Sequence, residues 1–343
     1  MSRLKVLEVQ GPAPRLSFRM ELLHDLNPDI VDGILGILPW QSFLLHVVVA
    51  GETIYMPAPS ISLSTKNMVP RRPGVAYFNT TSQSICFCYG VVTESTLVNQ
   101  FAQVVEQDLP KLIGLGRVVY EQNISRKVPQ IVSATVTRPG DASTNVSSEQ
   151  PGRVVFGDQD VLAKDWRAVK GVIDNEITRL RLPEEPDDIK RIRLGAVQSR
   201  AGDENSPFQT IVFLQGFLST LGPHIFSRLL VVSTYPDMTM TLMVRQTREF
   251  LLETFNHFDF LADLGLTRTR DIGRLYAATL DYMTTLSEYR SLTDSMRTMI
   301  QLLYRWVHLV FPWFIKDLFQ FRSPEEVRNL PKLQVYSEPV LNK

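Results

Sequence analysis

Two hydrophobic periodicities divide this chain of 343 residues, and they constrain its fold more than any other feature. Before about residue 125, apolar residues alternate or form short runs. Leu16, Phe18, Met20 and Leu22 are an example, typical of a strand with one buried face. From about residue 207 they recur every three or four residues, which is typical of helices. The pattern therefore predicts an α+β protein, in which a β-rich part is followed by an all-α bundle.

The β-rich part begins with a strand and a short helix. Asn27 followed by Pro28 predicts the start of this helix, since Asn caps helices well and Pro is favoured in their first turn. Pro39 is expected to end it. The run 43–49 is apolar on both faces, as the wall of a barrel packed on both sides would be. Further strands are expected at 53–56, 75–78 and 85–91.

The end of the β-rich part is expected to hold one more helix and one more strand. Leu97, Phe101 and Val104 lie at helical spacing and predict a helix at 96–109, which Pro110 ends. Gly114 and Gly116 oppose a continuation of that helix. The apolar residues that follow predict a final strand at 118–121.

The helical part has the periodicity of a bundle of four or five helices. Ile272, Leu275, Tyr276, Thr279 and Met283 show the spacing most clearly. A further helix is predicted at 160–181. We therefore expect a β-barrel domain at 1–160 that carries the active site, a connector at 161–206, and a helical bundle at 207–343. The bundle also offers a surface for a homodimer.

Composition excludes several classes of protein. Lys plus Arg and Asp plus Glu both number 36, and this balance argues against nucleic acid as the main partner. Cys86 and Cys88 are the only cysteines, without zinc-ligand spacing to histidine, so we expect reduced thiols and no metal. The apolar stretches 208–234 and 300–315 are interrupted, so no membrane span is expected. The first residues do not resemble a signal peptide. We therefore expect a cytoplasmic protein without a membrane partner.

Several short segments occur in an order that resembles cyclophilin-like barrels, in particular their bacterial small-molecule branch. They are Leu38-Pro39, Leu45-His46, Gly51-Glu52, Lys66-Asn67 and Pro73 to Tyr77. With a helical half attached, the chain resembles the cucumopine and mikimopine opine synthases over nearly its full length. The resemblance implies opine synthesis from L-histidine and 2-oxoglutarate. The expected product is a tetrahydro-imidazopyridine with three carboxyl groups, and its stereochemistry is left open.

This reaction balances without redox chemistry. An amine and a ketone condense to an imine, an imidazole carbon attacks the iminium carbon, and the ring loses a proton, as in a Pictet–Spengler cyclisation. A nicotinamide-binding domain would show G-x-G-x-x-G between a strand and a helix. Gly114-Leu-Gly116 instead lies between a predicted helix and a predicted strand. We therefore expect no cofactor. A reductive opine synthase that uses NAD(P)H, a prolyl isomerase and a cyclophilin-like binding module without catalysis are the alternatives.

Four residues are candidates for acid–base catalysis. The resemblance favours His46, because small-molecule barrels carry histidine at the matching place, and burial would keep it neutral. Glu52 follows at the end of the same strand and could serve as the base. Glu21 could line the pocket from another strand, and Tyr77 could donate a proton or stack on imidazole. Structural roles, such as a buried histidine or a packed tyrosine, are the alternatives for each.

Four further residues are candidates for binding substrate. Lys66, Arg71 and Arg72 place three positive charges near one loop, which suits substrates rich in carboxylates. Asn67 could orient a carboxylate. A solvated basic loop is the alternative. The bundle histidines His224, His257 and His308 lie among aromatic residues, where a structural role is expected.

Overall fold

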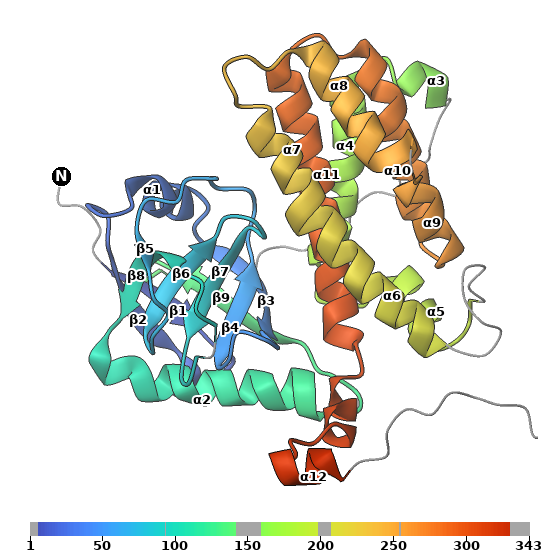
Figure 1. Ribbon diagram of the computed structural model, residues 1–343. Coiled ribbons are helices and arrows are strands. Elements are labelled where there is room, and N and C mark those ends of the chain that lie inside the picture. Colours follow the sequence, from blue (N-terminus) through green and yellow to red (C-terminus); the bar gives the residue numbers. More distant parts are fainter. Residues whose placement is uncertain (1–5, 93, 142–158, 198–206, 254, 330–343) are drawn as a thin grey trace, which may run out of the picture.

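The computed structural model describes residues 6–92, 94–141, 159–197, 207–253 and 255–329. In this part of the chain a β-barrel lies beside a bundle of helices (Figure 1). The predicted fold class, a barrel followed by an all-α bundle, is confirmed. None of the described helices combines the length and the apolar character that crossing a membrane requires.

The barrel is built from antiparallel strands. Among the described residues these are β1 (Val6–Gln10), β2 (Phe18–Leu22), β3 (Trp40–His46), β4 (Thr53–Pro57), β5 (Met68–Val69), β6 (Val75–Asn79), β7 (Ser84–Cys88), β8 (Val98–Val104) and β9 (Val132–Thr137). Their order is β2-β1-β9-β3-β4-β7-β6-β8-β5, and β2 also pairs with β8. This last pairing closes eight of the strands into a barrel and leaves β5 outside it. The short helix α1 (Pro28–Gly36) lies where the sequence predicts it.

Side-chain alternation gives the barrel wall two buried faces. Leu44, Ile54 and Phe87 belong to the core inside the barrel. Leu45 and Tyr77 belong to a second core that is shared with the helices. Successive strand residues point to opposite faces, so strands between two cores are apolar throughout. The strand predicted at 43–49 with two buried faces is confirmed for residues 43–46 of β3, whereas Val48 and Val49 lie beyond the strand and are exposed.

Two predictions about the end of the barrel are wrong. Residues 98–104 form strand β8 instead of a helix, and α2 (Leu109–Tyr120) occupies the place of the expected last strand. Strand β8 is buried on both faces, so its apolar residues show no alternation that separates a strand from a helix. Pro110 lies in the first turn of α2, where its missing N–H costs nothing.

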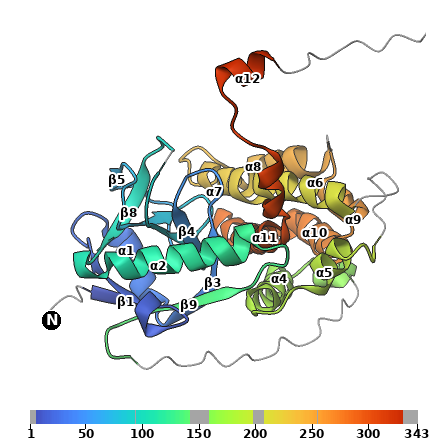
Figure 2. The same cartoon turned by 90° about the horizontal axis from the view of Figure 1, so that it is seen from below.

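Helix α2 tolerates its glycines because it lies close against the barrel. A Cβ atom at Gly116 would overlap the ring of Tyr89. Figures 1 and 2 show α2 running along one end of the barrel. The glycine that opposes helix formation by propensity is therefore required here by packing.

The bundle is arranged around one long helix, α11 (Leu286–Val310), most of whose residues are buried. The other described helices are α3 (Gln159–Leu162), α4 (Trp166–Arg181), α5 (Asp187–Arg193), α6 (Pro207–Thr220), α7 (Ser227–Val232), α8 (Met240–Arg248), α9 (His257–Asp263), α10 (Thr267–Thr279) and α12 (Pro324–Arg328). π-helical turns continue α2 at Glu121–Ser125, α6 at Leu221–Phe226 and α8 at Glu249–Glu253. A 3-10 turn at Trp313–Leu318 follows α11.

The region expected as a connector, 161–206, contributes α4 and α5 to the bundle. Helix α4 packs along α11, and the indole N–H of Trp306 donates a hydrogen bond to the carbonyl oxygen of Leu180 at 2.7 Å. The apolar stripe of α4 includes Val169, Ile173 and Ile177. The helix predicted at 160–181 is confirmed from Trp166 to Arg181. Residues 198–206 and 330–343 of the predicted regions lie outside the described residues.

Helix α11 presents a row of polar side chains to the barrel. Arg297, Gln301, Arg305 and His308 share one helix face, since they are four, four and three residues apart. Arg297 donates to the Ser60 hydroxyl at 2.8 Å, and Gln301 to the Thr81 carbonyl at 2.8 Å. Arg305 donates to the Ser84 hydroxyl at 3.2 Å, and His308 to the His46 carbonyl at 3.0 Å. We call these four residues the polar row of α11.

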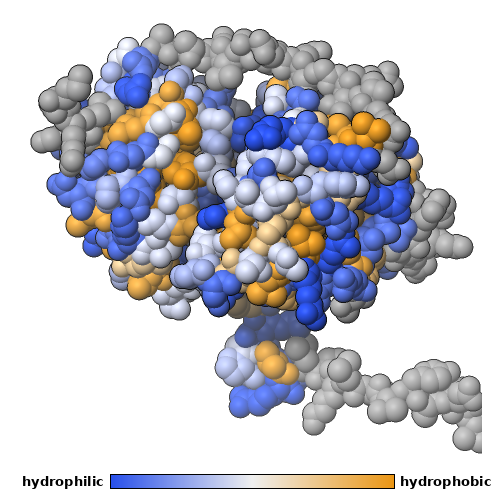
Figure 3. All heavy atoms as spheres, turned by 90° about the horizontal axis from the view of Figure 1, so that it is seen from above, coloured by the Kyte–Doolittle hydropathy of each residue, from blue (hydrophilic) through white to orange (hydrophobic). Residues whose placement is uncertain are grey.

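The surface mixes polar and apolar residues. On the face that Figure 3 shows, hydrophobic residues form separate patches among hydrophilic ones. Below this surface, buried aromatic side chains join the barrel to the bundle. The rings of Phe43 in β3 and Trp306 in α11 lie 5.3 Å apart between centroids.

We expect Gly116→Ala to destabilise the protein by roughly 1–3 kcal/mol, because its methyl group forces α2 away from Tyr89. Gly171→Ala in α4 is the matched control, since a Cβ there meets no atom within 4 Å. That control should stabilise the protein by about 0.5–1 kcal/mol. Urea denaturation of both variants measures the difference, and equal effects would contradict the packing argument.

Candidate active site between the barrel and the bundle

A pocket of about 580 Å³ lies between the barrel and the bundle. Strands β6 and β8 and the loops before them form one side, and α6, its π-turn and α11 form the other. The side chains that carry its chemistry are Arg71, Tyr77, Glu94, His224, Tyr304 and Arg305. Its size suits a small metabolite. We call it the interface pocket.

Arg71 and Glu94 form an ion pair in this pocket. The guanidinium and the carboxylate are 3.0 Å apart, and only 8% of the Arg71 side chain is exposed. Arg71 also donates to the carbonyl oxygen of Thr96 and lies 5.6 Å from the centre of the Tyr77 ring. Burial raises the pKa of Tyr77 well above its ordinary value, an effect that Arg71 opposes. The hydroxyl of Tyr77 therefore stays protonated and can donate a hydrogen bond.

Arg305 brings a second buried guanidinium to the interface pocket. It is 6% exposed and lies over the rings of Tyr55 and Tyr304, at 4.2 and 5.0 Å. Ser84 accepts one of its hydrogen bonds, and its Nε has no partner among the described residues. The aromatic rings stabilise the cation, but no described carboxylate pairs with it. A buried cation without an anion is costly, which favours an anionic ligand.

The bundle closes the interface pocket with an interrupted helix. The π-helical turn Leu221–Phe226 places Pro223 and the exposed His224 at its rim. π-Turns inside helices occur often at functional sites. His224 is therefore placed to exchange protons between a bound molecule and water.

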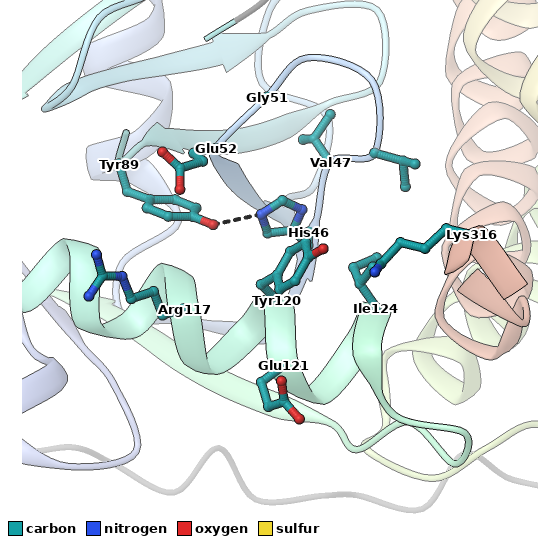
Figure 4. Close-up of a pocket in the computed structure, with 11 residues that line it drawn as sticks. His46, Val47, Gly51, Glu52, Tyr89, Arg117, Tyr120, Glu121, Ile124 and Lys316 are labelled. Carbon is teal, nitrogen blue, oxygen red and sulfur yellow. Dashed lines mark hydrogen bonds between the residues drawn. The ribbon is translucent and has the colours of Figure 1, made fainter. Parts of the chain in front are cut away.

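A second pocket of about 560 Å³ lies at the end of the barrel that α2 covers (Figure 4). We call it the mouth pocket. His46 is 4% exposed there, and its Nε2 lies 2.9 Å from the Tyr89 hydroxyl. Burial lowers the pKa of His46 to about 4 and raises that of Tyr89 to about 12. Both groups are therefore neutral near pH 7, and a single hydrogen bond joins the imidazole to the hydroxyl.

Glu52 forms part of the wall of the mouth pocket. Its carboxylate accepts a hydrogen bond from the Val91 backbone N–H at 2.5 Å. Gly90 makes this possible, because a Cβ there would overlap the carboxylate. Figure 4 shows Glu52 beside Tyr89, with Arg117 and Lys316 on two sides of the pocket.

The structure divides the predicted catalytic residues between the two pockets. His46 and Glu52 line the mouth pocket, whereas Tyr77 lines the interface pocket. The cause is strand alternation: His46 continues the inner row of Leu44, and Tyr77 faces outward toward the bundle. Glu21 is exposed on β2 opposite Gln103 and lines neither pocket.

The predicted binding residues are also separated. Arg71 lines the interface pocket, but Arg72 is exposed and lines neither pocket. Lys66 pairs with Asp29 at 2.8 Å on the surface. Asn67 donates to the Gln100 carbonyl at 3.0 Å and so ties the segment before β5 to strand β8.

Sequence reasoning missed Glu94 and the role of Arg305. Glu94 lies in a loop without a pattern, and only the fold brings it to Arg71. Arg305 carries a usable signal, because a charged residue interrupts an otherwise apolar helical stretch. Buried charges of this kind are commonly functional or paired.

The chain is a barrel-and-bundle protein with two buried arginine side chains, Arg71 and Arg305, at a pocket between its halves. Residues 171–310 match the family model of the cucumopine synthase C-terminal helical bundle domain. This match lies in the helical half of the chain, and it confirms there the resemblance drawn from the sequence. A comparison with curated proteins found no match.

Solved structures extend this likeness in fold to the barrel. McbB, solved in complex with tryptophan, aligns with a TM-score of 0.80 at 23% sequence identity. The match covers 92% of this chain and 100% of McbB. The hypothetical protein AF2241 from Archaeoglobus fulgidus has 18% identity over 40% of this chain, and its TM-score of 0.30 is too low to indicate a shared fold.

We expect the free energy of unfolding to fall as the pH drops from about 6.5 toward 4. Burial lowers the pKa of His308 to about 3 and that of His46 to about 4, whereas an unfolded histidine titrates near 6.5. In this range the unfolded chain binds more protons than the folded one, so acid favours unfolding. Each group contributes up to about 1.4 kcal/mol per unit of pKa difference.

Urea denaturation across this pH range measures the effect. His308→Gln should be less stable than the wild type at pH 7 and should lose less stability on acidification. An identical slope for the variant and the wild type would contradict the assignment of His308 as a buried neutral group.

Proposed function

We propose that this protein is an opine synthase-like enzyme that joins L-histidine to 2-oxoglutarate without a redox cofactor, and that the interface pocket is its active site. The bundle family and the barrel-and-bundle fold support an enzyme of this kind. McbB shares the fold and binds tryptophan, which, like histidine, is an α-amino acid with an aromatic heterocycle.

The arrangement of charge in the interface pocket carries the proposal. Two buried guanidiniums, Arg71 and Arg305, face one carboxylate, Glu94. The substrates together bring three carboxylates and one ammonium group. Arg71 and Arg305 would bind the carboxylates of 2-oxoglutarate, since guanidiniums form paired hydrogen bonds with such groups. The amino acid would then lie nearer to Glu94.

The reaction requires proton transfers that this pocket can supply. The amine of histidine attacks the keto carbon, and water leaves as the imine forms. Glu94 is placed to take the ammonium proton and to return a proton to the departing hydroxyl. The imidazole carbon then attacks the iminium carbon, forming the carbon–carbon bond, and Glu94 or His224 accepts the proton that restores aromaticity. Tyr77 can hydrogen-bond to the oxygen that leaves.

The direct test is to incubate the purified protein with L-histidine and 2-oxoglutarate in the absence of nicotinamide. We expect a product whose mass is the sum of the substrates less one water. Histidine deuterated at the attacking ring carbon should lose its deuterium. A product that forms only with NADPH and keeps the deuterium would support a reductive synthase instead. No product with or without NADPH would favour a binding module.

We expect Glu94→Gln to lower kcat by about 100-fold or more, because the acid–base group is lost. Arg71→Met should lower kcat/KM by roughly 10- to 100-fold through loss of a charge-assisted contact. Arg72→Met is the matched control, because Arg72 is next to Arg71 in the chain but is exposed and lines neither pocket. Steady-state kinetics with 2-oxoglutarate varied measures each value, and equal losses for the two arginines would contradict the assignment.

A further inference from the structure

We propose that the mouth pocket is a second binding site, specific for an α-amino acid with a planar ring, and that it is distinct from the interface pocket. This inference goes beyond the reaction proposed above, because it assigns a ligand to a separate cavity. It rests on the charges, the ring floor and the rigid wall of that cavity.

The charges of the mouth pocket match a zwitterion. The Glu52 carboxylate accepts only the Val91 amide among the contacts of the described residues, so it can still bind an ammonium group. The exposed Arg117 has no ion-pair partner among the described residues and can bind a carboxylate. Lys316 pairs with Asp317 at 2.9 Å and adds a second positive charge nearby. Glu52 would repel a dicarboxylate, whereas a zwitterion satisfies both Glu52 and Arg117.

The floor of the mouth pocket is aromatic. The ring of His46 meets those of Tyr89 and Tyr120 edge to face, at centroid distances of 5.8 and 5.0 Å. Ile124 and Val47 add apolar surface. A planar ring gains contact area and favourable edge-to-face geometry on such a floor. Figure 4 shows the three rings gathered between the strand that carries His46 and helix α2.

The wall of the mouth pocket is held rigidly in place. The π-helical turn that ends α2 positions Asn123, whose side-chain oxygen accepts the backbone N–H of His46 at 3.2 Å. The amide nitrogen of Asn123 donates to the Gln130 carbonyl at 3.2 Å. Gly116 allows Tyr89 to lie against α2. The rings of the floor are therefore arranged before any ligand binds, which reduces the entropic cost of binding.

The polar row of α11 connects the two pockets. His308 donates to the carbonyl oxygen of His46, and Arg305, one turn earlier, lines the interface pocket.

Isothermal titration of a Glu94→Gln variant of the full chain tests the proposal. The variant removes the carboxylate near which the amino-acid substrate would lie in the interface pocket. The probes are L-histidine, L-phenylalanine and L-tryptophan, with glycine as the control that lacks a ring. We expect at least one probe to bind with one equivalent per chain. Glu52→Gln or Arg117→Gln, added to this background, should weaken that binding by at least tenfold. Glu106→Gln is the matched control, because it changes an exposed carboxylate in the 3-10 turn before α2. This change should leave the affinity for the probe unchanged.

Three outcomes would overturn the assignment. These are no binding by any probe, binding that survives both Glu52→Gln and Arg117→Gln, and equal binding of glycine, which lacks a ring. If Glu94→Gln does not fold by circular dichroism, Arg71→Met, which removes the ion-pair partner of Glu94, replaces it as the background. Failure here leaves the synthase reaction untouched, since that reaction is measured separately by product formation.

Discussion

The contact between α11 and the barrel is the constraint on which the rest of the structure depends. A helix most of whose residues are buried carries four polar side chains on one face, and each one bonds to the barrel. Arg297 is fully buried, and it bonds to Ser60 and pairs with Asp294. Buried polar groups of this kind are expensive unless they are satisfied, so they fix one relative position of barrel and bundle.

That fixed position explains why the proposed active site lies between the two halves of the chain. Arg305 reaches the outer wall of the barrel at the place where Tyr77 and the Arg71–Glu94 pair lie. Neither half alone would contain both guanidiniums. The bundle is therefore more than a support for the barrel, because it supplies one of the two cations on which the proposed carboxylate binding depends.

The architecture could be predicted from periodicity, whereas the location of the site could not. The alternation of Phe18 and Met20 and the helical spacing in the second half follow directly from which faces are buried. The pattern predicts a helix where strand β8 lies and a strand where helix α2 continues, and both predictions are wrong. A strand buried on both faces shows no period, and Gly116 is present for packing against Tyr89. Local patterns cannot show such long-range contacts.

The candidate site shows the same limit. Arg71 and Tyr77 could be selected from residue type and a short motif, and they lie together. His46 and Glu52 were predicted as catalytic too, but they line another cavity. His46 lies on the inner face of β3, and Glu52 lies in the turn before β4. Glu94 and Arg305, 211 positions apart by their numbering, meet at the pocket only through the tertiary fold.

The most direct measurement is a crystal structure of the protein with 2-oxoglutarate bound. The account predicts that the carboxylates of 2-oxoglutarate lie against Arg71 and Arg305, with the keto carbon facing Glu94. Density for 2-oxoglutarate in the mouth pocket beside Glu52, with the interface pocket empty, would contradict it.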